Sequence, residues 1–207
     1  LNGKLVVITG ASKGIGKELA IQMAALGAKV NLLARSEKEL EGVRNRILTN
    51  GGHCEIFAGD VTDGVFVNHA VGETIKKFGT VDIVINNAGF GIFKPSDETT
   101  AAEWDSVFAT NVKGTFLVTN AVIPIMKKMK KGHIINIASD VAKRVFAGGS
   151  LYCASKYAQD AYSMAIRKEL RPSNIKVSVV YSGLVDSAFH SDPQGHDSHS
   201  WWLKNED

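Results

Sequence analysis

The chain has 207 residues, a length that fits one domain large enough to bury a core. Its 44% hydrophobic and 22% charged residues exclude a disordered or fibrous protein, and a formal net charge of +3 gives no reason to expect a nucleic-acid partner. No apolar run is long enough to cross a membrane and the N-terminus lacks a signal-peptide pattern, so we expect a cytoplasmic protein without a membrane partner.

Short apolar runs alternate with amphipathic segments of helix length along the chain. The runs predict buried strands at residues 4–9, 29–33, 53–58, 81–85, 132–138 and 175–181. The amphipathic segments predict a first helix ending near Gly27 and further helices at residues 36–49, 63–78, 100–131 and 149–170. Ser36 and Asp63 are the expected N-caps, Gly114 should weaken the fourth helix, and Pro124 should kink it. Strict alternation predicts an α/β fold: a doubly wound parallel sheet of the Rossmann type, in three α/β/α layers.

Ligands of such a sheet bind at the carboxyl ends of the strands, and polar or glycine-rich segments follow those ends here. Residues 9–16 read Thr-Gly-Ala-Ser-Lys-Gly-Ile-Gly, a loop whose glycines let the backbone approach a pyrophosphate at a helix N-terminus. Arg35 follows the second strand, where a carboxylate would suit a ribose hydroxyl. An arginine suits a 2′-phosphate instead, and Lys13 adds a second positive charge, although Arg35 alone is also typical of a solvated surface.

Tyr152 and Lys156 stand four residues apart on a predicted helix, so their side chains share one face. An ammonium about 5 Å from a phenolate attracts it by roughly 3 kcal/mol at an effective dielectric constant of about 20. A phenol whose pKa is lowered in this way can exchange a proton with a carbonyl oxygen. The same spacing more often reflects an aromatic ring packed under a lysine stem, so only other motifs can support a catalytic interpretation of the pair.

In these motifs the chain resembles the short-chain dehydrogenase/reductase family, in its compact single-domain branch. The residues that carry the resemblance, in family order and spacing, are Thr9-Gly10-x-x-x-Gly14-x-Gly16, Asn86-Asn87-Ala88-Gly89, Asn111, Ser139 and Tyr152-x-x-x-Lys156. The similarity runs from about residue 4 to residue 187. We therefore expect residues 1–187 to form one dinucleotide-binding and catalytic domain.

The resemblance implies a catalytic set of four residues. Tyr152 would be the acid or base, and Lys156 would lower its pKa and bind the nicotinamide ribose. Ser139 would hydrogen-bond the substrate oxygen, and Asn111 would hold a water in a proton relay ending at Lys156. In reduction, hydride would pass from the cofactor to a carbonyl carbon while Tyr152 protonates the oxygen.

The resemblance also implies a cofactor, NADP(H), because Lys13 and Arg35 are similar to the basic residues of NADP-preferring members. The implied cofactor-binding residues are Gly10, Ser12, Lys13, Gly14, Ile15, Gly16, Arg35, Asp60, Val61, Asn87, Ala88, Gly89, Tyr152, Lys156, Gly183, Val185 and Ser187. No metal is expected, because the only two cysteines, Cys54 and Cys153, lack metal-ligand spacing and read as free thiols of a reducing compartment.

Two features depart from the family pattern. Ser182 stands where members carry a proline after the sixth strand, which predicts a looser turn. The chain also stops before the family's final strand, so the strand at 175–181 would be an unprotected edge unless a partner or a longer natural chain covers it. Residues 188–207 are expected to be a substrate lid or a truncated C-terminal part, with Trp201 and Trp202 packing it onto the body.

The resemblance implies a small carbonyl or alcohol substrate, for which we expect an apolar portion. Expected walls of its cleft are Phe90, Phe93, Val141, Phe146 and Leu184, and Lys143 and Arg144 either meet a substrate anion or are solvated. A lysine cluster, Lys127, Lys128, Lys130 and Lys131, resembles the carrier-binding face of 3-oxoacyl reductases, which makes such a substrate the alternative within this class. A dinucleotide-binding sensor with little catalysis is a further alternative. Family members commonly form homodimers or homotetramers, and we expect one of these states.

Overall fold

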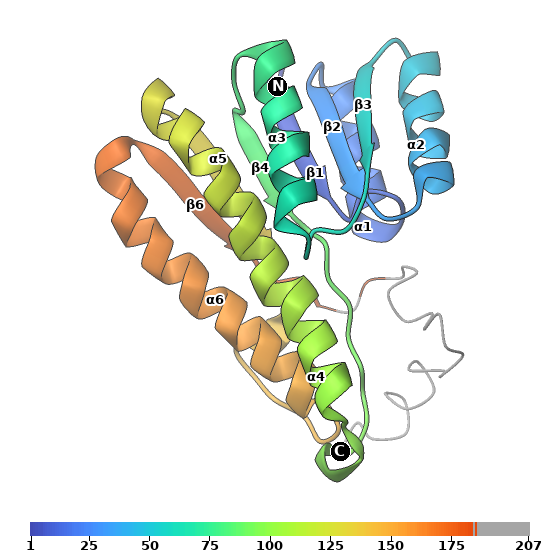
Figure 1. The fold of residues 1–207 in the computed structure, drawn as a ribbon, viewed down its shortest axis with the longest axis vertical. Coiled ribbons are helices and arrows are strands. Elements are labelled where there is room, and N and C mark those ends of the chain that lie inside the picture. The colour runs from blue at the N-terminus through green and yellow to red at the C-terminus, as the bar shows by residue number, and fades with distance from the viewer. Residues whose placement is uncertain (184, 186–207) are drawn as a thin grey trace.

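The computed structural model describes residues 1–183 and residue 185. Six parallel strands form one sheet in the order β3-β2-β1-β4-β5-β6, and helices cover both of its faces (Figure 1). The predicted doubly wound α/β fold is confirmed. Leu184, Ser187 and the whole segment 188–207, with its predicted lid role, lie outside the described residues.

The elements follow the predicted alternation closely. The strands are β1 (Leu5–Thr9), β2 (Lys29–Ala34), β3 (His53–Ala58), β4 (Ile83–Asn86), β5 (Gly132–Ile137) and β6 (Ile175–Val180). The α-helices are α1 (Gly14–Ala25), α2 (Glu37–Thr49), α3 (Gly64–Phe78), α4 (Ala101–Phe108), α5 (Thr115–Met129) and α6 (Ser150–Leu170). Ser36 and Asp63 accept backbone N–H hydrogen bonds as the N-caps of α2 and α3, as predicted.

The chain reverses its direction of travel across the sheet between β1 and β4. From β1 it moves outward through β2 to β3, and then returns to place β4 on the other side of β1. The loops after β1 and after β4 therefore diverge at a switch point, which is where open α/β sheets bind ligands. The sequence motifs at residues 10–16 and 87–89 are both located there.

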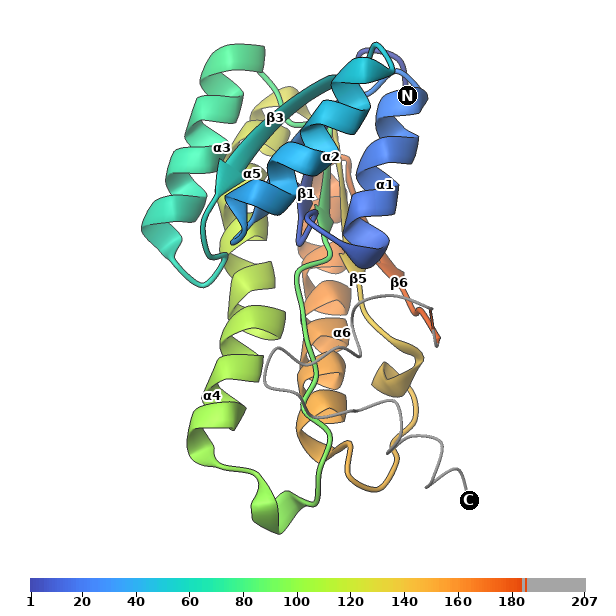
Figure 2. The ribbon, with the colours of Figure 1, turned by 90° about the vertical axis from the view of Figure 1, so that its right-hand side faces the viewer.

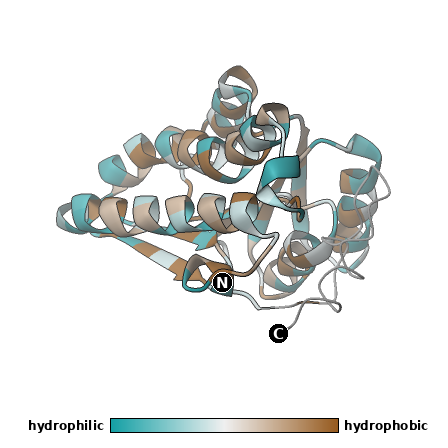
Figure 3. Ribbon diagram, turned by 90° about the horizontal axis from the view of Figure 1, so that it is seen from below, coloured by the Kyte–Doolittle hydropathy of each residue, from teal (hydrophilic) through white to brown (hydrophobic). Residues whose placement is uncertain are grey.

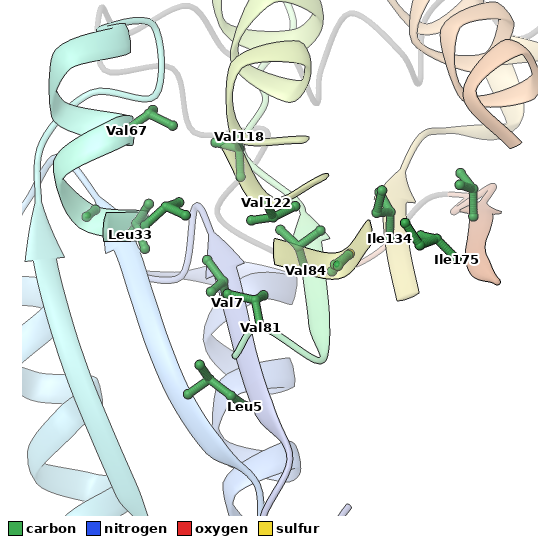
Figure 4. Close-up of a cluster of buried hydrophobic side chains, with 14 of the residues drawn as sticks. Leu5, Val7, Leu33, Val67, Val81, Val84, Val118, Val122, Ile134 and Ile175 are labelled. Carbon is green, nitrogen blue, oxygen red and sulfur yellow. The ribbon is translucent and has the colours of Figure 1, made fainter. Parts of the chain in front are cut away.

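Two apolar cores hold the layers together, one on each face of the sheet. The core under α3, α5 and α6 joins Val7, Val84 and Ile134 of the strands to Val67 and Val118 of the helices (Figure 4). The second core packs α1 and α2 against β1 and β2. Figure 2 shows the sheet between these helix layers, and Figure 3 shows apolar and polar residues alternating along the helices, as expected of helices with one buried face.

The long fourth helix is interrupted near Gly114, one of the two places predicted. Helix α5 runs through Pro124 without a break, and both Pro124 and Asn120, whose carbonyl lacks its helical N–H partner because of the proline, are exposed. The interruption is a π-helical turn, η2 (Ala109–Gly114), which joins α4 to α5 as one long helix in Figure 1. Gly114, predicted to weaken the helix, is the last residue of this turn.

Strand β6 is the edge of the sheet within the described residues, and β5 is its one partner. Val180 at its end is 45% exposed. The expected edge without a seventh strand is thus present in the part of the chain that the structure describes. Among the same residues no helix is both long and apolar enough to span a membrane.

Candidate active site

The loop between β1 and α1 keeps its backbone close to the loop after β4. Gly10 has a φ of +63° and Gly14 of +54°, conformations that residues with a Cβ rarely adopt. A Cβ on Gly10 would lie 2.8 Å from the Ala88 Cα, and a Cβ on Gly16 would lie 2.3 Å from the Gly10 carbonyl oxygen. The glycines therefore let the two loops pack directly on each other.

Asn87 ties these loops together. Its side-chain amide donates hydrogen bonds to the Thr9 and Gly10 carbonyl oxygens, both at 3.1 Å. The backbone N–H groups of Asn87 and Ala88 both donate to the Thr9 hydroxyl at 3.0 Å. Thr9, named in the sequence only as the start of the glycine motif, thus also joins the two loops through its hydroxyl.

The start of α1 fits an anionic ligand. Gly14 begins the helix, and Lys13 at the N-cap makes no side-chain capping hydrogen bond within the described residues. The first N–H groups of a helix have no partner inside the helix and favour negative charge. Ser12 and Ile15 are half-buried beside them. A pyrophosphate group fits this loop, because bare glycine backbone and free N–H groups are what such a group requires.

Positive charge lies beside the loop, as predicted. Arg35 is exposed directly after β2, and Lys13 is exposed before α1. Lys13 Nζ lies 3.7 Å from Glu39 Oε1, an exposed ion pair of the kind that contributes little to stability. Ala34, the residue before Arg35, is buried and uncharged. No carboxylate therefore stands at the position where a ribose hydroxyl would be bound.

The loop after β3 is held by its own hydrogen bonds. Asp60 Oδ1 accepts the Thr62 N–H at 2.9 Å, and the Asp60 carbonyl accepts the Asp63 N–H at 3.0 Å. The Val61 side chain is buried against the π-helical turn, where a Cβ on Gly114 would stand 2.8 Å from Val61 Cγ2. The Val61 side chain thus belongs to the core, and the adenine contact predicted at Val61 stays a prediction, now for its backbone.

Asn111 lies in the π-helical turn and is fully buried. Its Oδ1 accepts the Phe90 N–H at 3.0 Å, while its Nδ2 donates to the Phe90 carbonyl at 2.9 Å and to Ser155 Oγ at 3.0 Å. The side chain thus anchors the loop after β4 to α6. Because the side chain is occupied by these bonds, the proton relay predicted for Asn111 would have to use its backbone carbonyl.

Lys156 is buried on α6 and reaches the end of β5. Its Nζ donates to the Ile137 carbonyl at 2.9 Å and to Gln159 Oε1 at 3.1 Å, and lies 5.7 Å from the centre of the Tyr152 ring. Burial lowers the pKa of Lys156 from 10.5 to about 8. A Cβ on Gly89 would stand 3.6 Å from Nζ, so the ammonium adjoins the loop after β4.

Tyr152 meets Ser139, which follows β5, and the pKa of the phenol differs from the prediction. Burial raises the pKa of Tyr152 well above its ordinary value, and the hydrogen bond with Ser139 lowers it only in part. The predicted lowering of the Tyr152 pKa is therefore wrong, because the loss of hydration is the largest effect on the phenol. The phenol is protonated at neutral pH and is able to act as an acid.

Aromatic rings cover one side of the phenol. Phe93 meets the Tyr152 ring edge-on with 5.3 Å between centroids, and Phe146 lies 5.9 Å from Phe93. Val141 packs into the same cluster. Phe93, Val141 and Phe146, three of the predicted substrate walls, thus lie together beside the phenol.

Ser182 holds the turn after β6 by hydrogen bonds. Its carbonyl accepts the Asp140 N–H at 3.0 Å, and its hydroxyl donates to the Ala138 carbonyl at 3.4 Å. These bonds connect the turn to the loop after β5 at the position where the family pattern has a proline, and a looser turn at Ser182 stays a prediction. Gly183 and Val185 follow, both exposed.

Asp160, a buried carboxylate on α6, is a further residue that the sequence reasoning missed. It pairs with Lys143 and accepts the Tyr181 hydroxyl at 2.6 Å. Burial raises its pKa, but hydrogen bonds from Lys143 and Tyr181 outweigh burial and hold the pKa below its usual range. Asp160 thereby ties the loop after β5 and the end of β6 to α6. Lys143, expected to meet substrate or solvent, belongs to this pair.

Comparison with known proteins agrees with the fold and the motifs. A family model described as short chain dehydrogenase matches residues 4–196. An uncharacterized oxidoreductase of Staphylococcus saprophyticus is 37% identical over 193 residues, which cover 93% of this chain and 82% of that protein.

Solved structures of similar proteins include an NADP complex and an NAD⁺ complex. A metagenomic short-chain oxidoreductase in complex with NADP is 37% identical, with a TM-score of 0.85 over 87% of this chain and 82% of that one. An NAD⁺-bound xylitol dehydrogenase is 31% identical, with a TM-score of 0.85 over 88% of this chain and 70% of that one. With the family model matching nearly its whole length, this chain belongs to the short-chain dehydrogenase family of oxidoreductases.

Proposed function

We propose that the protein is a cytoplasmic NADP(H)-dependent oxidoreductase that interconverts a carbonyl and a secondary alcohol. The observation that carries this proposal is the geometry around the Tyr152 phenol, which hydrogen-bonds with Ser139 and has the buried Lys156 ammonium 5.7 Å from the centre of its ring. The cofactor, when bound, supplies or accepts the hydride. Two buried, free cysteines, Cys54 and Cys153, support a reducing compartment.

Each site residue has a distinct task in the proposed reduction. Tyr152 donates its proton to the carbonyl oxygen, and Ser139 hydrogen-bonds the same oxygen. Lys156 stabilises the negative charge that develops on the Tyr152 oxygen, an attraction that a buried site strengthens. Phe93 and Phe146 supply the apolar surface for the rest of the substrate.

The choice of NADP over NAD rests on Arg35 and Lys13, supported by the NADP complex of the metagenomic relative. We expect wild-type protein to oxidise NADPH in the presence of at least one member of a panel of ketones, aldehydes, steroids, sugars and 3-oxoacyl thioesters. Replacing Arg35 with alanine should weaken NADPH binding by about 10- to 100-fold, the scale of one lost charge-assisted hydrogen bond. NADH binding should be unchanged.

Arg46→Ala is the matched control, because Arg46 is an exposed arginine in the last turn of α2. Both dissociation constants should be those of the wild type in this variant. Equal losses of NADPH and NADH affinity in Arg35→Ala would remove the 2′-phosphate assignment. Tight NADPH binding without turnover on any carbonyl would favour the sensor alternative instead.

The carrier-linked 3-oxoacyl alternative rests on a lysine cluster that lies away from the Ser139 end of the sheet. The lysine cluster lies at the end of α5 that leads into the first residue of β5, and Lys131 pairs with Asp82 at 3.4 Å. Ser139 follows the opposite end of β5, about 20 Å away along a six-residue strand. These lysines therefore do not line the site.

The proposal includes a homodimer as the smallest working assembly. A hollow of about 570 Å³ on α4, η2, α5 and α6 is lined by Trp104, Phe108, Val112, Phe116 and Tyr162 among others. Trp104 is 43% and Phe116 45% exposed, so a second copy seated there would remove apolar surface from water. Light scattering measures this state, and a monomer at working concentration would contradict it.

A further inference from the structure

The Lys156 ammonium is held by two acceptors at the base of the site. An ammonium has three N–H donors and no acceptor, and a buried charge is tolerated only where acceptors meet it. The Ile137 carbonyl is the first acceptor, at 2.9 Å, and Gln159 Oε1 is the second, at 3.1 Å. The backbone carbonyl is given by the fold, whereas the second acceptor depends on the residue type at position 159.

Gln159 is itself fixed in orientation. It is 1% exposed and lies three residues after Lys156 on α6. Its Nε2 donates to Thr115 Oγ1 at 3.0 Å, and the Thr115 hydroxyl donates to the Asn111 carbonyl at 2.9 Å. Because Lys156 can only donate and the Thr115 hydrogen is directed at Asn111, the amide oxygen of Gln159 must face the ammonium.

The π-helical turn explains why the Asn111 carbonyl needs this hydroxyl. In a regular α-helix that carbonyl would accept the Thr115 N–H, four residues on. Here the Thr115 N–H bonds to the Val112 carbonyl instead, and the Thr115 hydroxyl turns to Asn111. Three hydrogen bonds thus run in one direction, from the ammonium of Lys156 through Gln159 and Thr115 to Asn111.

We propose that Gln159 is a positioning residue, which holds the Lys156 ammonium under Tyr152 and joins it through Thr115 to the Asn111 carbonyl. The proposal rests on the proposed function, in which Lys156 must be charged. It adds that the side chains of Gln159 and Thr115 connect the Lys156 ammonium to the Asn111 carbonyl. The charged form of Lys156 therefore depends on Gln159, so replacing Gln159 should change the pH at which Lys156 titrates.

The test measures the pH at which Lys156 titrates, by NMR of ¹³Cε-labelled lysine in the cofactor-free protein. Gln159→Leu keeps the volume and removes the acceptor, so the midpoint should fall below that of the wild type by about one pH unit or more. Gln159→Glu places a carboxylate there, so the midpoint should rise. The upper pH limit of NADPH binding, followed by NADPH fluorescence, should move in the same directions.

Ser163→Ala is the matched control, because the Ser163 hydroxyl donates to the Gln159 backbone carbonyl at 2.6 Å without touching Lys156. It removes two buried hydrogen bonds, this one and the one that Ser163 Oγ accepts from Asn136 Nδ2 at 2.7 Å, and should leave the midpoint unchanged. An unshifted midpoint in folded Gln159→Leu, or shifts of the same sign in the Leu and Glu variants, would overturn the role of Gln159. A wild-type protein that titrates as expected but never reduces a carbonyl would refute the proposed function and leave this role standing.

Discussion

Replacing Tyr152 with phenylalanine is expected to lower kcat for carbonyl reduction by about 10²- to 10⁴-fold, the contribution of a positioned general acid. The phenylalanine ring keeps the edge-on contact with Phe93, so the fold and NADPH binding should survive. Stopped-flow measurement of NADPH oxidation under single-turnover conditions separates this loss from slow product release. Turnover at the wild-type rate would refute the assigned acid.

Tyr157→Phe provides the control, since Tyr157 is an exposed tyrosine of the same helix. It loses the same hydroxyl group and should retain wild-type kcat.

The pH dependence of the wild-type rates gives a second test of Tyr152 as the acid. Because burial raises the pKa of Tyr152, the phenol keeps its proton through the neutral range, so reduction should hold its rate until Lys156 begins to lose its proton near its pKa of about 8. The reverse oxidation needs the phenolate and should increase with pH over the same range.

Replacing Gly16 with alanine is expected to give the second large effect, a loss of NADPH affinity together with a loss of stability. The new Cβ would stand 2.3 Å from the Gly10 carbonyl oxygen and 2.5 Å from Asn87 Nδ2, so the glycine loop must move. Strain of about 1–3 kcal/mol falls on the loop that cradles the phosphates, which corresponds to about tenfold weaker binding or more. Fluorescence titration and urea unfolding measure the two losses.

Gly42 offers the opposite case. It lies inside α2, and a Cβ there would meet no atom within 4 Å. Gly42→Ala should raise the free energy of unfolding by about 0.5–1 kcal/mol, because alanine loses less conformational freedom in a helix. Its NADPH affinity should be that of the wild type. NADPH affinity unchanged in Gly16→Ala would show that the close contacts at the glycine loop have no part in cofactor binding.

Most of the fold was predictable, because its determinants are local. Apolar runs marked all six strands to within two residues, and Ser36 and Asp63 marked two helix starts by their capping chemistry. Gly114 correctly marked the α4–α5 interruption, whereas α5 continues unbroken through Pro124. On an exposed helix face, water can satisfy the carbonyl that a proline leaves unpaired, so a proline there does not end the helix.

Site residues that belong to sequence motifs were predictable, whereas residues whose role depends on their burial were less so. Gln159 and Asp160 are polar residues whose role depends on facing the interior, and helical spacing alone did not distinguish their face from a solvated one. The pKa of Tyr152 was mispredicted for a related reason. Sequence spacing reveals the charge beside the phenol but not the loss of water around it, which is the larger effect.

The π-helical turn also means that the number of residues between α4 and α5, and not only their identity, determines which side chains face the core. One additional residue in a turn rotates the preceding helix by about 100° relative to a regular α-helix. Deleting a single residue from Ala109–Gly114 would therefore turn the fully buried Val107 out of the core, or else carry Asn111 away from Phe90 and Ser155. Single-residue deletions should be tolerated in the exposed turn at residues 49–51. The same deletions in Ala109–Gly114 should destabilise the fold, although both segments lie far from the chain ends.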